Sequence, residues 1–190
     1  MSALNCLNYL LDINPRYTSS IIKWNGVGKI VKMTQNIEYI DCAEMVIKAI
    51  EKMSFENPYA MIENDAFAAI LSLIDFFDMN LRKSALKACL NMTRVINNMD
   101  YIKKFILPAI PSLTNLTKFS GNTDLEKSIL DLAVSCFYNI VFCIKNYNLQ
   151  THNQDFYTNM IVYGLLENLF EVFEKFINVE ENGNTKSNNL

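Results

Sequence analysis

The sequence predicts an all-α protein made of repeated helical units, on three observations. Only 5 Gly and 4 Pro interrupt the 190 residues, and 51% of the residues are hydrophobic. Apolar residues recur every three or four positions, which is the period of an amphipathic helix. The helical segments also follow one order of length, short then medium then long, several times along the chain. A chain of this length can bury a substantial core.

Four long helical segments carry apolar residues that superimpose at nearly constant offsets. They are predicted at about 3–13, 40–54, 81–96 and 124–145. The matching apolar positions, at offsets of 40, 39 and 48 residues, are Leu7, Ile47, Leu86 and Val134. A three-helix unit of roughly 40–47 residues is typical of armadillo and HEAT repeats. The predicted fold is therefore an armadillo/HEAT-like α-solenoid of about four three-helix repeats.

The medium helices support the same repeat, because each begins at a small residue after a break. These starts are Gly26, Ala66, Ala109 and Gly164. The second medium helix is predicted to run from Ala66 to Phe77, so that Phe76 and Phe77 end a core helix. Asp41 is expected to cap the long helix that follows it, and Trp24 to pack against a neighbouring repeat. A closed helical bundle is the alternative fold, but it has no reason to repeat its helix lengths.

The repeat domain is predicted to cover residues 1–177. Residues 178–190 are rich in Asn, Glu, Lys and Gly, and are predicted to form a disordered polar tail. Because the chain begins inside a long third helix, we expect it to be a fragment of a longer solenoid.

Composition argues against several classes of function. A net charge of −3 does not indicate a nucleic-acid binder, and no membrane partner is predicted either. The apolar run from Ile129 to Ile144 is short for a membrane span and contains Asp131 and Asn139, so a buried helix is expected. With five Cys, no CxxC motif and a single His (His152), neither a zinc site nor another cofactor is predicted. The cysteines are interpreted as buried thiols of a cytoplasmic or nuclear protein.

Function is predicted on the polar face of the four long helices. In a stacked solenoid, these positions would lie side by side along a concave groove. The predicted groove residues are Asn8, Asp12, Lys48, Lys52, Lys87, Asn91, Arg94, Ser135 and Asn139. Their Asn side chains could bond the backbone of an extended peptide, and the central cations favour an acidic protein or peptide partner. The alternative is an ordinary solvated helix face without a ligand.

Two stretches, Cys42–Ser54 and Ala60–Ile96, resemble the armadillo region of HECT-type ubiquitin ligases, most closely the ubiquitin-fusion-degradation group that includes the thyroid-receptor-interacting ligase. The similar motifs are Ala43-Glu44, Ile74-Asp75-Phe76-Phe77, Arg82-Lys83-Ser84-Ala85-Leu86 and Ser135–Val141. The sequence departs from the family at Asp65-Ala66, where the family has a glycine pair, at Asn91-Met92-Thr93, where it has Asn-Cys-Cys, and at Asn139, where it has Arg.

The resemblance implies a scaffold that recognises ubiquitin or a ubiquitinated substrate. In that family the transfer chemistry belongs to a separate HECT domain, so no catalysis is expected from this chain. The alternative is an armadillo-type transport or signalling adaptor that binds an extended peptide. A nuclear-import adaptor is disfavoured because Asn8, Lys48, Lys87 and Ser135 stand where such adaptors carry a Trp ladder. A small helical hydrolase is disfavoured because the chain has one His and no nucleophile motif.

Overall fold

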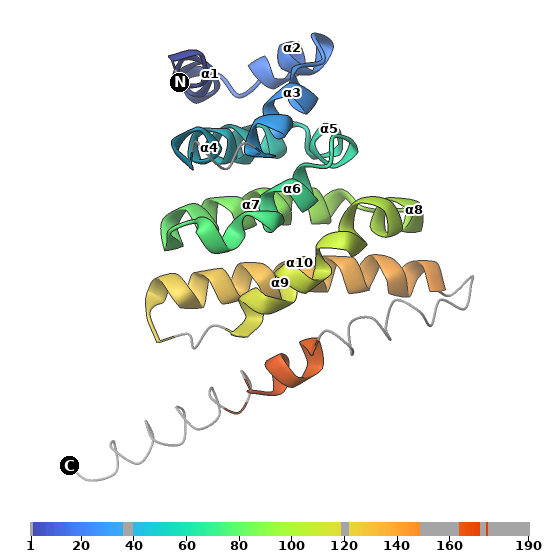
Figure 1. Cartoon of the computed structure of the whole chain (residues 1–190). Coiled ribbons are helices and arrows are strands. Elements are labelled where there is room, and N and C mark those ends of the chain that lie inside the picture. Colours follow the sequence, from blue (N-terminus) through green and yellow to red (C-terminus); the bar gives the residue numbers. More distant parts are fainter. Residues whose placement is uncertain (1, 36–39, 119–121, 149–163, 172–173, 175–190) are drawn as a thin grey trace, which may run out of the picture.

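The computed structural model describes residues 2–35, 40–118, 122–148, 164–171 and 174, and in these ranges the chain forms helices and turns without a strand (Figure 1). The α-helices are α1 (Ser2–Ile13), α2 (Tyr17–Lys23), α3 (Gly26–Lys32), α4 (Ile40–Glu56), α5 (Pro58–Glu63), α6 (Ala66–Ser72), α7 (Met79–Val95), α8 (Met99–Tyr101), α9 (Ile110–Asn115) and α10 (Asp124–Asn148). Residues 165–171 are also helical. Three parts of the sequence lie outside the described residues: His152, the segment 156–163, whose apolar spacing also predicts a helix, and the predicted tail at 178–190.

The long helices α1, α4, α7 and α10 are stacked one on another in chain order (Figure 1). Each stacking contact joins consecutive members, α1 with α4, α4 with α7, and α7 with α10. The shorter helices lie along the same stack and complete three-helix units. This arrangement is the predicted solenoid rather than a closed bundle, because the long helices form a row and do not enclose a common centre.

The core is continuous along the stack. One cluster of buried apolar side chains extends from Leu4 in α1 to Leu165 in the last described helix. In α10, Ile129, Cys136 and Ile140 are fully buried members of that cluster. Among the described helices, the stretch Asp124–Asn146 of α10 is long and apolar enough to cross a membrane, a test that a core helix also passes. Helix α10 therefore buries one face in the core, whereas Tyr138 and Phe142 are 67% and 53% exposed, so the prediction of a buried helix holds for one face only.

Side-chain caps start the helices where the sequence breaks. The Asp78 carboxylate accepts a 2.7 Å hydrogen bond from the Leu81 amide, so α7 begins at Met79, two residues earlier than predicted. Asn57 accepts a 3.1 Å bond from the Ala60 amide and Pro58 occupies the first turn, which starts α5. Asp41 is not a cap, because it lies within the first turn of α4, where its charge faces the positive end of the helix dipole.

A left-handed residue joins the first and second helices in two of the repeats. Asn25 has φ 50° before α3, and Asp65 has φ 61° before α6. Gly164 has φ 74° before the last described helix. The same backbone reversal therefore recurs at three of the four predicted starts. The fourth differs, because Ala109 has φ −102° at the end of a 3₁₀ turn and α9 begins at Ile110.

Substitution of Asn25 tests this backbone constraint. Its side chain makes no capping hydrogen bond, so only the cost of the left-handed conformation should change. We expect Asn25→Gly to raise the free energy of unfolding by roughly 0.5 kcal/mol and Asn25→Ala to lower it by roughly 1 kcal/mol. Urea unfolding of the native chain and both variants measures their order of stability. An Ala variant as stable as the Gly variant would show that the left-handed conformation at position 25 is not costly.

The prediction that a core helix runs from Ala66 to Phe77 and ends with two buried phenylalanines is only half right. Helix α6 ends at Ser72 and continues as a 3₁₀ turn at Ile74–Phe76, so it is shorter than predicted. Arg82 holds this turn, because its guanidinium donates to the carbonyls of Phe77 and Asp75 at 2.8 and 2.9 Å. Phe77 is buried as expected, but Phe76 is 62% exposed.

Trp24 does not pack between repeats as predicted, because it is 77% exposed at the C-terminal end of α2. The chain reverses at Asn25 immediately afterwards, and Val27, Ile30 and Val31 of α3 enter the core instead. The reversal explains why the tryptophan remains at the surface.

Candidate interaction groove

Three open hollows follow one another along the stack of long helices. The first lies between α1 and α4 and has a volume of about 480 Å³, and the second, about 540 Å³, lies between α4 and α7. The third, about 380 Å³, lies between α7 and α10. Lys52 lines the first and second hollows, and Arg94 lines the second and third. The three hollows are therefore adjacent along one face of the stack, and this face is named here the long-helix groove.

The structure places eight of the nine predicted groove residues in these hollows. Asn8, Asp12, Lys48 and Lys52 line the first, Lys52, Lys87, Asn91 and Arg94 the second, and Arg94 and Asn139 the third. Ser135 is half-buried on α10 and lies outside all three. The structure thus brings the predicted residues onto one face, while their role in binding remains a prediction.

Lys52 joins the first two long helices at the start of the groove. Its ammonium lies 2.7 Å from a carboxylate oxygen of Asp12, and donates to the backbone carbonyl and side-chain Oδ1 of Asn8 at 3.3 and 3.2 Å. The Asn8 amide donates to the carbonyls of Leu4 and Met45 at 3.1 and 2.9 Å. Both amide hydrogens of Asn8 are therefore already used, so this side chain stabilises the α1–α4 contact rather than offering donors to a peptide.

The other two groove lysines also have acidic neighbours. Lys87 on α7 lies 3.4 Å from Glu51 on α4, and Lys48 lies 4.0 Å from Glu44 one turn earlier on the same helix. Exposed pairs of this kind contribute little stability, but they neutralise charge locally. Arg94 differs, because no acidic side chain of the described chain pairs with it. The groove was predicted to be basic at its centre. Because its three lysines lie beside carboxylates, Arg94 is the cation of that predicted set without an acidic neighbour.

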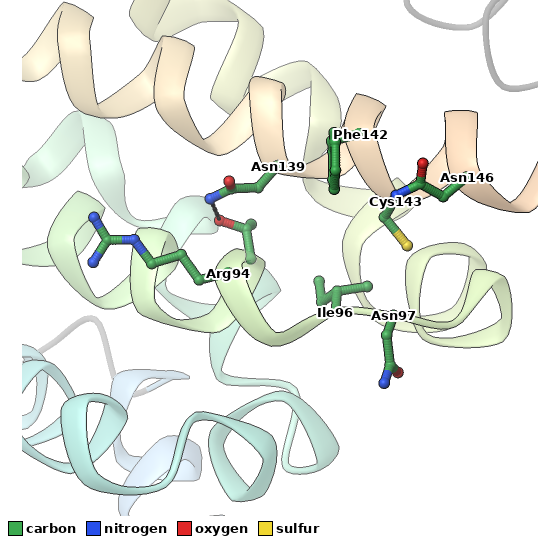
Figure 2. Close-up of a pocket in the computed structure, with 8 residues that line it drawn as sticks. Arg94, Ile96, Asn97, Asn139, Phe142, Cys143 and Asn146 are labelled. Carbon is green, nitrogen blue, oxygen red and sulfur yellow. Dashed lines mark hydrogen bonds between the residues drawn. The ribbon is translucent and has the colours of Figure 1, made fainter.

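Two asparagines one repeat apart are oriented in the same way. Asn91 on α7 donates to the Ser54 hydroxyl on α4 at 3.1 Å, and Asn139 on α10 donates to the Thr93 hydroxyl on α7 at 3.2 Å (Figure 2 shows the second pair). Each bond uses one amide hydrogen and fixes the plane of the amide. The second hydrogen and the carbonyl oxygen can then bond the C=O and N–H of an extended chain.

Cys89, Cys136 and Cys143 are buried as predicted, whereas Cys6 is exposed and Cys42 is half-buried. The three buried thiols are unsuited to nucleophilic chemistry at neutral pH. Burial raises the pKa of Cys136 to about 12, although the hydrogen bond with Thr93 and the charge of Arg94 act in the opposite direction. Burial also raises the pKa of Cys89 and of Cys143, which borders the third hollow. A thiol with a raised pKa is protonated and a poor nucleophile. Within the described residues, no group of three or more His, Cys, Asp or Glu side chains could hold a metal ion.

The groove also contains exposed aromatic residues that the sequence prediction omitted. Phe55 on α4 is 76% exposed and lines the second hollow, and Phe142 on α10 is 53% exposed and lines the third. Tyr138 stacks on Phe142, with ring centroids 6.0 Å apart. Phe55 and Phe142 each follow a predicted groove residue, Lys52 or Asn139, by three positions. Extending the predicted polar face of α4 and α10 by one helical turn would therefore have included both residues.

Sequence comparison relates this chain to known proteins. Residues 1–63 match the family model described as E3 ubiquitin-protein ligase TRIP12-like, TPR repeats. The chain is 32% identical to the E3 ubiquitin-protein ligase UPL3 of Arabidopsis thaliana over 126 residues, which are 65% of this chain and 6% of the relative. It is 25% identical to the E3 ubiquitin-protein ligase TRIP12 of Danio rerio over 139 residues, 73% of this chain and 6% of the relative.

A fungal relative matches more of the chain. Ubiquitin fusion degradation protein 4 of Saccharomyces cerevisiae is 22% identical over 172 residues, which are 90% of this chain and 11% of the relative. The chain thus spans only a small part, 6 to 11%, of the length of these ligases.

Structural comparison supports the repeat architecture. A designed armadillo repeat protein in complex with the peptide (KR)4 superimposes with a TM-score of 0.65 and 20% identity, over 91% of this chain and 67% of the designed one. This likeness establishes the armadillo fold. Taken with the sequence matches, it shows that the chain is homologous to the armadillo-like repeat region of HECT-type ubiquitin ligases of the TRIP12 and ubiquitin-fusion-degradation family.

Proposed function

We propose that this chain is a non-catalytic interaction scaffold, the part of a HECT-type ubiquitin ligase that recognises a substrate or ubiquitin. One observation carries the proposal: three adjacent hollows follow one another along the stacked long helices, as expected for a site that holds an extended segment. Ubiquitin transfer is proposed for a part of the protein outside this region, because the relatives match it over 6 to 11% of their length.

The bound partner is proposed to be an extended protein segment. Packed helices lie about 8–10 Å apart and an extended chain advances about 3.3 Å per residue, so roughly nine residues would span the four long helices. The oriented amides of Asn91 and Asn139 supply hydrogen bonds to its backbone, while Phe55 and Phe142 offer apolar contact area. The designed armadillo protein is in complex with a peptide, which supports this mode of binding.

A cytoplasmic or nuclear location is part of the proposal. All five cysteines are free thiols, and Cys89, Cys136 and Cys143 are buried. Free thiols without disulfides fit a reducing compartment, in which ubiquitin-dependent recognition would take place.

Selection of random peptides on the immobilised chain tests the groove. Peptides enriched in the selection should bind at least about tenfold more weakly to the double variant Phe55→Ala/Phe142→Ala, because two exposed aromatic contacts are lost. Trp24→Ala is the matched control, since Trp24 is exposed outside the groove. Displacement of a selected peptide by free ubiquitin would identify ubiquitin as an occupant.

Two results would contradict the proposed function. The first is a selection that enriches no peptide at all. The second is a loss of binding in Trp24→Ala as large as in the double groove variant, which would place the peptide elsewhere on the surface.

A further inference from the structure

Three equivalent positions on consecutive long helices carry an aromatic residue, an arginine and an aromatic residue. Phe55 on α4 and Arg94 on α7 are 39 residues apart, and Arg94 and Phe142 on α10 are 48 residues apart. These are the same offsets that relate the helices to one another. The three side chains, named here the Phe–Arg–Phe row, are all exposed. Each lies one turn beyond Lys52, Asn91 or Asn139 on its own helix.

The hollows show that the row is continuous. Phe55 and Arg94 both line the second hollow, and Arg94 and Phe142 both line the third. Figure 2 shows the third hollow, with Arg94 and Phe142 on either side of the Asn139 amide. A ligand that follows the groove from α4 to α10 therefore meets an apolar surface, then a cation, then a second apolar surface.

Arg94 is the groove cation that has no acidic partner among the described residues. The ammonium groups of Lys52 and Lys87 lie 2.7 and 3.4 Å from Asp12 and Glu51, whereas the described residues give Arg94 no ionic partner. The third hollow contains no Asp or Glu among its lining residues, and Glu51, the acidic residue that lines the second, is paired with Lys87. A guanidinium can bind a carboxylate through two parallel hydrogen bonds, so the charge of this site selects an acidic side chain.

We propose that the long-helix groove recognises an extended segment in which one acidic residue stands between two apolar residues. The acidic side chain binds Arg94, the apolar ones contact Phe55 and Phe142, and Asn91 and Asn139 bond the backbone between them. Helices 8–10 Å apart and an advance of about 3.3 Å per residue place each apolar residue two or three positions from the acidic one. This inference rests on the proposed function, and adds the class of sequence that the groove selects.

Labelled synthetic peptides test the selection by fluorescence anisotropy. The probes are Leu-Ser-Glu-Ser-Leu and Leu-Ser-Ser-Glu-Ser-Ser-Leu within a Gly-Ser frame, with Gln or Lys in place of Glu as comparisons. We expect the better Glu peptide to bind about tenfold more tightly than its Gln counterpart, the effect of one charge-assisted bidentate contact, and the Lys peptide to bind more weakly still. Peptides with Ser in place of both Leu residues should lose affinity as well.

Variants of the row assign the effect to its residues. Arg94→Gln should bind the Glu and Gln peptides equally, and Arg94→Glu should reverse the preference and favour the Lys peptide. Lys103→Gln is the matched control, because Lys103 is an exposed cation outside the groove and should leave the preference unchanged. Circular dichroism and thermal unfolding confirm that each variant is folded.

The possible failures are distinguishable. If the native chain binds Glu, Gln and Lys peptides equally, while Phe55→Ala/Phe142→Ala still weakens binding, the groove holds peptides but the acidic selection is overturned. A preference for Glu that survives Arg94→Gln also overturns it. If neither these probes nor selected peptides bind the native chain, the proposed function fails and the inference fails with it.

Discussion

Replacing Phe67 with alanine is expected to lower the free energy of unfolding by about 3–5 kcal/mol. Phe67 lies in α6 and is completely buried. Helix α6 contacts α5 and α7 of its own repeat, the Met33–Gln35 turn of the preceding repeat and the Leu107–Ala109 turn of the next. Because a solenoid is stabilised by contacts between neighbouring repeats, a cavity at this position weakens both sides of the stack.

Phe76→Ala is the matched control for this prediction. It removes the same side chain from a position that is 62% exposed, so the expected change is within roughly 0.5 kcal/mol. Urea unfolding followed by circular dichroism measures both variants. If the two substitutions cost the same, α6 does not occupy the centre of the core that the structure gives it.

Stability is expected to fall steeply in alkaline solution because of the buried thiols. The pKa of Cys136 is raised by burial from its ordinary value of 9.0 to about 12. Above about pH 9 the unfolded chain loses this proton while the folded chain keeps it, so the unfolded state binds fewer protons and stability decreases as pH rises. The decrease is about 1.4 kcal/mol per pH unit, or roughly 2–3 kcal/mol between pH 9 and pH 11, from Cys136 alone.

Cys136→Ala isolates the contribution of this thiol. The variant should be less stable than the native chain at neutral pH, but its stability should fall by roughly 2–3 kcal/mol less between pH 9 and pH 11. Other groups that titrate in this range, such as lysines and tyrosines, act on both proteins alike. Urea unfolding in the presence of a reductant gives the two curves, and parallel curves would show that Cys136 is not buried as a neutral thiol.

Much of the fold could be predicted from local sequence patterns. Apolar spacing located the four long helices to within a few residues, because a helix that buries one face must repeat apolar residues every three or four positions. The caps at Asn57 and Asp78, together with the left-handed residue at Asn25, act through the chain immediately around them. Such contacts are visible in the sequence because their partners are only a few residues away.

Two of the errors occurred where a distant or following residue decided the outcome. The early end of α6 depends on Arg82, which binds carbonyls of the turn from the next helix. The exposure of Trp24 depends on how the chain reverses at Asn25 and on which face of α3 enters the core. The apolar spacing around Phe76 and Trp24 is the same as around a core residue. Periodicity alone therefore could not show that these two side chains are exposed.

The sequence by itself determined the helical class, the order of the repeats and the polar face of the long helices. Only the tertiary structure decided which charges on that face are available. The pairs Lys52–Asp12 and Lys87–Glu51 join residues 40 and 36 positions apart, and the bonds Asn91–Ser54 and Asn139–Thr93 join residues 37 and 46 positions apart. Each contact forms only when two repeats stack, and Coulomb interactions depend on that distance rather than on the order of residues along the chain.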